Sequence, residues 1–225
     1  MEQEYIVDIA HVSKIYKGAS GEARVLDDVS LRIRKGAFVG IVGDSGSGKT
    51  TLLNVIGGMD TVTDGSISVA GETITDFDEK ERTRYRRNQV GFIFQDYNLI
   101  DELTVCENIL LPFQLRKKSV DMAIIDRFLG ALHLAEKKNA FPAQLSGGEQ
   151  QRTAILRALL PGPDIVLADE PTGNLDSKNT QAVVALLHRF SSRMGYTILF
   201  VTHNTALTKH CSRVVCVQDG QVVER

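Results

Sequence analysis

The sequence predicts an α/β fold with a mainly parallel central sheet, an N-terminal antiparallel β lobe and an inserted helical lobe at about 96–144. Apolar, β-branched runs at 36–42, 164–168 and 196–202 are typical of buried strands in a parallel sheet. Strand-like patterns dominate 5–34, whereas the inserted lobe has a helical pattern. For a chain of 225 residues we expect one domain that carries this lobe as an insertion.

The other elements follow in chain order. The N-terminal lobe is expected to contain short strands at 6–9, 25–26, 29–33 and 65–69, the last followed by a turn at Gly71. In the inserted lobe we expect helices around Leu110 and over 120–134, with Pro112 and Pro142 as interruptions. The apolar positions 182, 183, 186, 187 and 190 predict a core-packed helix over 177–193. A hairpin turning at Asp219 and Gly220 closes the chain.

A glycine-rich loop connects the strand at 36–42 to a helix over 50–56, which Gly57 and Gly58 end. The pattern G-x-x-x-x-G-K-T between a strand and a helix predicts a phosphate-binding loop and hence a P-loop NTPase core. Its amides and the helix N-terminus would surround the β-phosphate. Lys49 would reach the β/γ oxygens, and the Thr50 hydroxyl would bind Mg²⁺. The expected nucleotide contacts are Gly43, Asp44, Ser45, Gly46, Ser47, Gly48, Lys49, Thr50 and Thr51.

Asp44 is an unusual residue for such a loop. A carboxylate beside phosphates is unfavourable unless it points to solvent, so we expect the Asp44 side chain to be exposed.

A second glycine-rich segment, LSGGEQQR, occupies 145–152. Ser146 and Glu149 have the spacing of a capping box, which predicts a helix from about Gly147 to Leu160. The sequence PGP at 161–163 ends that helix. Its exposed N-terminus, with a serine and glycine amides, is also suited to bind an anion.

A phosphate loop followed by LSGGEQQR resembles the ATP-binding cassette (ABC) ATPases, and the resemblance extends from about Tyr5 to the last residue. It implies an ATPase that uses Mg²⁺. In this family the second segment contacts the γ-phosphate held by another copy, so ATP is bound between two cassettes. The resemblance therefore implies a homodimer in which Ser146, Gly147, Gly148 and Glu149 contact the partner's ATP.

The same resemblance assigns roles to residues elsewhere in the chain. Asp169 and Glu170 follow the strand at 164–168, where Asp169 would bind Mg²⁺ and Glu170 would be the general base. Adjacent residues at a strand end diverge, so one can face the metal and the other the attacking water. Gln95 would sense metal and water, and His203 would contact the γ-phosphate. Asp176 would communicate across the dimer while also capping a helix, and Tyr16 would stack on adenine.

Bulk properties exclude other classes. A net charge of −2 argues against a nucleic-acid partner, and the basic stretch 80–87 is interpreted as a solvated helix face. No apolar run is long enough to insert into a membrane, and the polar N-terminus is unlike a signal peptide. Cys106, Cys211 and Cys216 have no disulfide or metal spacing, so we expect buried, reduced thiols. We expect a cytoplasmic protein held at the inner face of the membrane by a permease.

Three stretches, 94–100, 145–152 and 170–176, resemble the ABC group of lipoprotein release, macrolide export and antimicrobial-peptide (bacitracin-type) resistance. This predicts an ATPase subunit that drives a membrane permease for export or extraction. An alternative is the cell-division relative, which signals across the membrane without moving cargo. Soluble ABC proteins of DNA maintenance or translation are a third, although this chain has neither their coiled coils nor a second cassette. A nucleotide kinase or GTPase would leave 145–148 and His203 unexplained. Cargo is chosen by the membrane subunit, so this sequence does not predict it.

Overall fold

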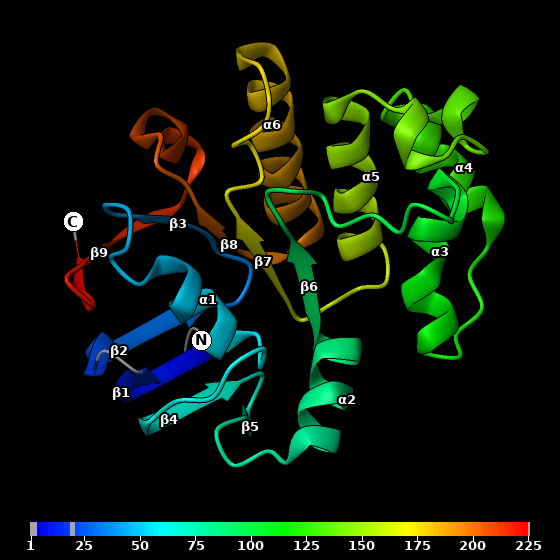
Figure 1. Cartoon of the computed structure of the whole chain (residues 1–225). Helices are drawn as coiled ribbons and strands as arrows, with labels where there is room; N and C mark the ends of the chain where they lie inside the picture. Colours follow the sequence, from blue (N-terminus) through cyan, green and yellow to red (C-terminus); the bar gives the residue numbers. More distant parts are fainter. Residues whose placement is uncertain (1–3, 19–20, 225) are drawn as a thin grey trace.

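A computed structural model of the chain describes residues 4–18 and 21–224. Its centre is a six-stranded sheet in the order β10-β9-β3-β8-β7-β6 (Figure 1). All neighbouring pairs are parallel except β9 with β10, which form the C-terminal hairpin. The strands are β3 (Phe38–Val42), β6 (Val90–Ile93), β7 (Ile165–Asp169), β8 (Thr197–Val201), β9 (Arg213–Gln218) and β10 (Gln221–Glu224). The predicted mainly parallel core is therefore confirmed.

The antiparallel lobe is a four-stranded sheet in the order β2-β1-β4-β5. Its strands are β1 (Tyr5–Gly18), β2 (Gly21–Arg34), β4 (Asp64–Val69) and β5 (Glu72–Thr73). The short strands predicted here were wrong in length, because 25–26 and 29–33 belong to one continuous strand. Register shifts interrupt the pairing, and His11 and Asp28 have positive φ values of 54° and 52°. Such bulges break the alternation of buried and exposed residues, so pattern alone shortens the strands.

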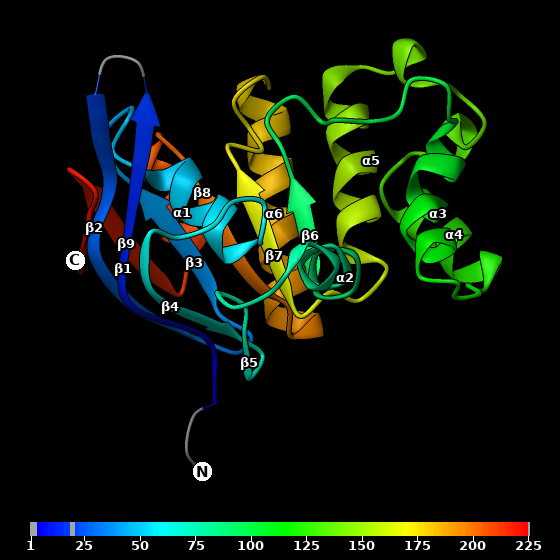
Figure 2. The same ribbon diagram turned by 60° about the horizontal axis from the view of Figure 1, so that its bottom comes forward.

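Helices cover both faces of the parallel sheet (Figures 1 and 2). Helix α1 lies between the two sheets, whereas α6 lies on the opposite face and α3, α4 and α5 form a separate group beside β6. The α-helices are α1 (Lys49–Ile56), α2 (Glu79–Gln89), α3 (Val105–Leu115), α4 (Met122–Ala131), α5 (Gly147–Leu159) and α6 (Ser177–Met194). Short 3-10 turns are η1 (Ala135–Lys137), η2 (Pro142–Gln144) and η3 (Thr205–His210).

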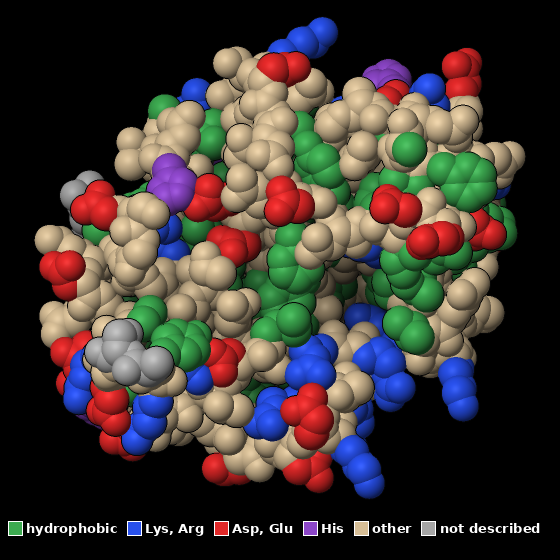
Figure 3. All heavy atoms as spheres, viewed as in Figure 1, with side chains coloured by type: hydrophobic (Ala, Val, Ile, Leu, Met, Phe, Trp, Pro, Cys, Tyr) green, Lys and Arg blue, Asp and Glu red, His purple; other side chains and the backbone are tan. Residues whose placement is uncertain are grey.

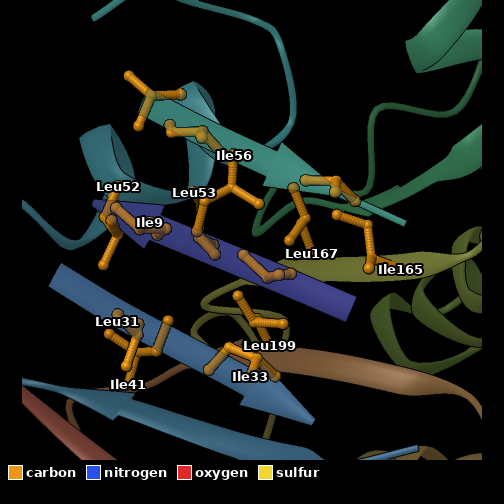
Figure 4. Packing of buried hydrophobic residues seen from close by; sticks show 14 of the residues in the cluster. Ile9, Leu31, Ile33, Ile41, Leu52, Leu53, Ile56, Ile165, Leu167 and Leu199 are labelled. Carbon is orange, nitrogen blue, oxygen red and sulfur yellow. The ribbon is translucent and has the colours of Figure 1, made fainter. Parts of the chain in front are cut away.

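Two hydrophobic clusters hold these layers together. One joins the antiparallel lobe and α1 to one face of the parallel sheet, as the packing of Ile9, Leu53 and Leu167 shows (Figure 4). The other joins the opposite face to α5, α6 and the α3–α4 helices. Helix α5 contributes Ile155 and Leu159 to this second cluster. The sheet therefore separates α1, which follows the phosphate loop, from α5, which follows Ser146.

Several finer predictions need correction. Pro112 lies inside α3 and does not interrupt it. A Thr104–Glu107 capping box and the buried Ile109 stabilise the helix before that position, which offsets the backbone hydrogen bond that proline cannot donate. Of the three thiols only Cys106 is buried, whereas the other two are half-buried; all three are free. In α6 the buried face includes Val184 and leaves Ala182 exposed.

Two expectations about the surface can be compared with the structure. Lys and Arg side chains gather over α2 (Figure 3), whose only buried residue is Tyr85, so the basic stretch is a solvated helix face. Within the described residues, every helix is too short or too polar to cross a bilayer. Residues 1–3 of the polar N-terminus lie outside the described part.

Candidate functional site

The loop between β3 and α1 requires glycine at two positions. Gly43 has φ 153°, and a Cβ there would lie 2.0 Å from the carbonyl oxygen of Val217. Gly48 has φ 106°, and its Cβ would lie 2.6 Å from the carbonyl oxygen of Val25. The loop backbone is therefore pressed against β9 and β2 on one side. At Gly46 a Cβ would meet no atom within 4 Å, so the opposite side of the loop is open to a ligand.

Lys49 lies at the start of α1 with its side chain folded back over the loop. Its ammonium donates to the Asp44 carbonyl at 2.5 Å and contacts the Ser47 hydroxyl at 3.4 Å. Among the described residues it has no ion pair, although it is only 5% exposed. An enclosed cation held only by neutral oxygens is suited to bind phosphate. The Asp44 side chain is exposed, as electrostatics requires beside such a ligand.

Thr50 and Asp169 form the second part of the site. The Thr50 hydroxyl donates to Asp169 Oδ1 at 3.3 Å, which joins the first turn of α1 to the end of β7. Burial raises the pKa of Asp169, while the Thr50 hydroxyl and Lys49 oppose that rise. The ionised Asp169 carboxylate is costly to bury without a nearby cation. Mg²⁺ binds one or two carboxylates together with phosphate oxygens, so Asp169 beside the Thr50 hydroxyl and the phosphate loop fits this ion. Within the described residues no group of three or more His, Cys, Asp or Glu could hold a metal by itself.

Glu170, the next residue, has a different partner. It lies just past the end of β7, has a positive φ of 45°, and pairs with Nε2 of His203, which follows β8. A glutamate in the left-handed region carries about 1–3 kcal/mol of strain, a feature that concentrates at functional sites. Both residues line a cavity of about 430 Å³ that reaches Thr180 on α6. The His203 side chain is 48% exposed and that of Glu170 is 23% exposed.

Gln95 follows β6 and contacts a residue that sequence analysis missed. Its Nε2 donates to Asn174 Oδ1 at 3.3 Å, and Asn174 Nδ2 donates to the Gln95 carbonyl at 3.3 Å and to Asp96 at 3.0 Å. The structure shows no contact between Gln95 and Asp169 or Thr50 among the described residues. The signal for Asn174 was present in the motif GNLD at 173–176. Asp176 is the N-cap of α6, as predicted, and accepts from the Asn179 amide.

The capping box predicted at the start of α5 is confirmed. Ser146 donates its amide to Glu149 Oε2 at 2.7 Å and its hydroxyl to the same oxygen at 2.9 Å. These contacts lower the pKa of Glu149, led by the Ser146 amide. Gly147 and Gly148 are tightly enclosed, since Cβ atoms there would lie 2.8 Å from the Tyr97 hydroxyl and 2.5 Å from Asn179 Oδ1. Ser146 itself is exposed.

The structure does not bring Ser146 to the phosphate loop of the same chain. Helix α1 and the start of α5 lie on opposite sides of β6 and β7 in both views (Figures 1 and 2). No hydrogen bond or ion pair joins 146–149 to 43–51 among the described residues. One chain therefore presents two separate candidate anion-binding elements.

Tyr16 lies on β1, where its ring is 41% exposed. Its hydroxyl donates to Asp60 Oδ2 at 2.7 Å, and Lys14 Nζ lies 4.8 Å from the ring centroid. Burial and then Asp60 raise the pKa of Tyr16. The Tyr16 hydroxyl is thus held by Asp60, and the Lys14 ammonium covers one face of the ring. Only the other face could stack on a base.

Comparisons with known proteins show what this chain resembles. Residues 26–173 match the family model described as ABC transporter. The chain is 41% identical over 220 residues to the bacitracin export ATP-binding protein BceA of Halalkalibacterium halodurans, covering 96% of this chain and 87% of the relative. It is 37% identical over 222 residues to the lipoprotein-releasing system ATP-binding protein LolD of Francisella tularensis, covering 97% and 96%.

A longer relative and two solved structures add to this. The chain is 38% identical to the macrolide export ATP-binding/permease protein MacB of Mannheimia succiniciproducens, covering 97% of this chain but 34% of that protein. The dimeric post-hydrolysis structure of the cassette MJ0796 of Methanocaldococcus jannaschii, bound to ADP and Pi, has a TM-score of 0.86 at 38% identity, covering 97% of this chain and 98% of that one. A second dimeric structure of MJ0796 has the same TM-score at 40% identity, covering 96% of each chain.

Proposed function

The chain belongs to the ABC transporter family and is an ATPase of that family, and we propose that it dimerises around two ATP molecules to drive a separate membrane permease. The proposed task is export or extraction of a peptide, lipoprotein or antimicrobial. Residues 1–225 would form one nucleotide-binding domain in which about 96–144 is the helical lobe.

The proposal of a dimer rests on the separation of the two candidate anion-binding elements. Helix α1, which follows the phosphate loop, and the start of α5 lie on opposite sides of β6 and β7, so neither element would complete the other's site within one chain. A second copy related by a two-fold axis would set Ser146 of each chain on the nucleotide of the other. The MJ0796 structures, which are dimeric, support a dimer.

Each side chain has a proposed task in hydrolysis. Thr50, Asp169 and Gln95 would hold Mg²⁺, which supplies charge neutralisation to the phosphates when bound. Lys49 would orient the β- and γ-phosphates. Glu170 would accept the proton of the attacking water, and His203 would donate to the γ-phosphate. Glu170 is paired with His203 through Oε1, so Oε2 is the oxygen that would accept the proton, while His203 Nε2 would exchange Glu170 for the phosphate.

A permease partner is proposed from the relatives. BceA and LolD are named as ATP-binding proteins of export and release systems, and MacB is named as an ATP-binding/permease protein of which this chain matches about a third. The chain matches 87% of BceA and 96% of LolD, whose names mention ATP binding alone, and this supports a permease on another chain. Such a subunit would lie on the cytoplasmic side, held to the membrane through its permease.

The test is recovery of the partner from membranes. A tagged Glu170→Gln chain, incubated with ATP in detergent-solubilised host membranes, should retain a protein with transmembrane helices and an external domain. Mass spectrometry identifies it, and the same chain without ATP together with Lys49→Ala serve as controls. Recovery of cell-wall hydrolases with a division-type membrane protein would replace transport by signalling. Recovery of no membrane protein would contradict both roles.

A further inference from the structure

The turn that follows Gln95 is held in an unusual backbone conformation. Tyr97 and Asn98 both have positive φ values, 62° and 47°. Consecutive left-handed residues other than glycine are costly, and they persist only where surrounding contacts hold them. A contact of this kind is therefore needed to keep the turn in place.

Arg157 supplies the contact from the last turn of α5. Its guanidinium donates to the Tyr97 carbonyl at 2.8 Å and to the Asn98 carbonyl at 2.5 Å. Burial lowers the pKa of Arg157, and no carboxylate lies within ion-pair distance of it among the described residues. If the turn moved away, a partly buried charge would lose its hydrogen-bond acceptors. The turn is therefore attached to α5.

The same turn reaches the other end of α5. The Tyr97 hydroxyl lies where any Cβ on Gly147 would be only 2.8 Å away. Gly147 and Arg157 are ten positions apart, roughly 15 Å along a helix. The turn thus lies along α5 and touches its first residue, next to Ser146.

Next to the turn, Gln95 is bonded to the 173–176 segment through Asn174. Asn174 bonds to both Gln95 and Asp96, and a Cβ on Gly173 would lie 3.0 Å from the Gln95 side chain. Gln95 and the start of α5 are therefore parts of one connected unit, although their proposed nucleotides are different ones.

We propose that Arg157 and Tyr97 are positioning residues that fix Gln95 relative to Ser146 and Gly147. The inference rests on the proposed ATP-bound dimer. In that dimer, Ser146 meets the partner's γ-phosphate while Gln95 serves the chain's own nucleotide. Because Arg157 and Tyr97 join these two parts, Gln95 moves together with Ser146 when Ser146 contacts the partner's ATP.

Arg157→Lys keeps the charge but loses the planar fork that reaches two carbonyls. In a Glu170→Gln background, we expect half-maximal ATP-dependent dimerisation to need about tenfold more ATP, the effect of losing one charge-assisted hydrogen bond. Light scattering measures dimerisation, and calorimetry measures ADP binding to the monomer, which should change less than about twofold. If Arg157 served folding alone, Arg157→Lys would change dimerisation and ADP binding together.

Arg116→Lys is the matched control. Arg116 also donates to two backbone carbonyls, those of Arg87 and Pro161, each at 2.6 Å, but it lies after α3. We expect its dimerisation to equal that of the Glu170→Gln parent. An equal shift in both arginine variants, or none in Arg157→Lys, would overturn the proposal.

Tyr97→Asn provides an independent variant should Arg157→Lys fail to fold. Asparagine tolerates the left-handed conformation and leaves the carbonyl that binds Arg157, but removes the ring beside Gly147. We expect weakened dimerisation with unchanged ADP binding, and parental dimerisation would overturn the role of Tyr97. If the Glu170→Gln parent does not dimerise with ATP at all, the proposed function fails and not this inference alone.

Discussion

The two glycine-rich segments of this chain are built in opposite ways. The phosphate loop is held by backbone against β9 and β2, and Lys49 beside it is 5% exposed. The segment at the start of α5 begins with an exposed Ser146 and is positioned by side chains from the 95–98 turn and from α6. In the proposed dimer, nucleotide affinity would be local to one chain. Hydrolysis, in contrast, would depend on how α5 is placed against a second copy.

Gly43→Ala is the strongest test of how the phosphate loop is held against β9. Its Cβ would meet the Val217 carbonyl at 2.0 Å with φ at 153°, so the loop must distort. We expect ATP binding to fall about 1000-fold, a cost of roughly 4 kcal/mol, measured by calorimetry. Gly71→Ala is the control, because it has a positive φ of 83°, meets no atom within 4 Å and lies outside the phosphate loop, and it should lose far less. Equal losses would show that the backbone fit is not what sets affinity.

The next effect separates binding from chemistry. Glu170→Gln keeps the shape of the side chain but removes the proton acceptor, so kcat should fall about 100- to 10,000-fold with ATP affinity nearly unchanged. Phosphate release measures kcat, and filter binding measures affinity. Hydrolysis at the parental rate would show that another group is the base.

Ser146→Ala tests the segment at the start of α5. It removes an N-cap, which costs about 1 kcal/mol, and a proposed contact to the partner's phosphate. Thr104→Ala removes the same kind of cap from α3, whose Thr104–Glu107 box has the same design. We expect both to lower thermal stability similarly, while only Ser146→Ala lowers ATPase activity, by about tenfold. Similar activities would mean that Ser146 serves only the helix.

The smallest expected effect concerns the carboxylate of Asp169 beside the phosphate loop. Burial raises the pKa of Asp169 above its usual 3.8, so its ionised form costs stability at neutral pH in the nucleotide-free chain. Asp169→Asn should therefore raise the melting temperature by a few degrees near pH 7 while lowering activity. The gain should disappear as the pH falls through the raised pKa towards the unfolded value. A melting temperature that falls at pH 7 would contradict this sign.

Most of the fold followed from local patterns. The strand–loop–helix around Gly43 and the capping box at Ser146 were predicted within a residue or two, because each depends on contacts between near neighbours in sequence. The long strands β1 and β2 were not, because bulges at His11 and Asp28 break the alternation. Pro112 was misread because burial of α3 outweighs the local cost of proline.

The sequence by itself determined the elements: a phosphate loop, a capped α5, and acidic residues after a strand. Only the tertiary structure decided which side chains meet. The pairing of Glu170 with His203, the link from Gln95 to Asn174, and the hold of Arg157 on the 97–98 turn all join residues far apart in the chain. The folded sheet also placed helix α1 and the start of α5 on opposite sides of β6 and β7. The physical reason is that caps and glycine turns depend on short-range geometry, whereas these contacts depend on how strands and helices pack.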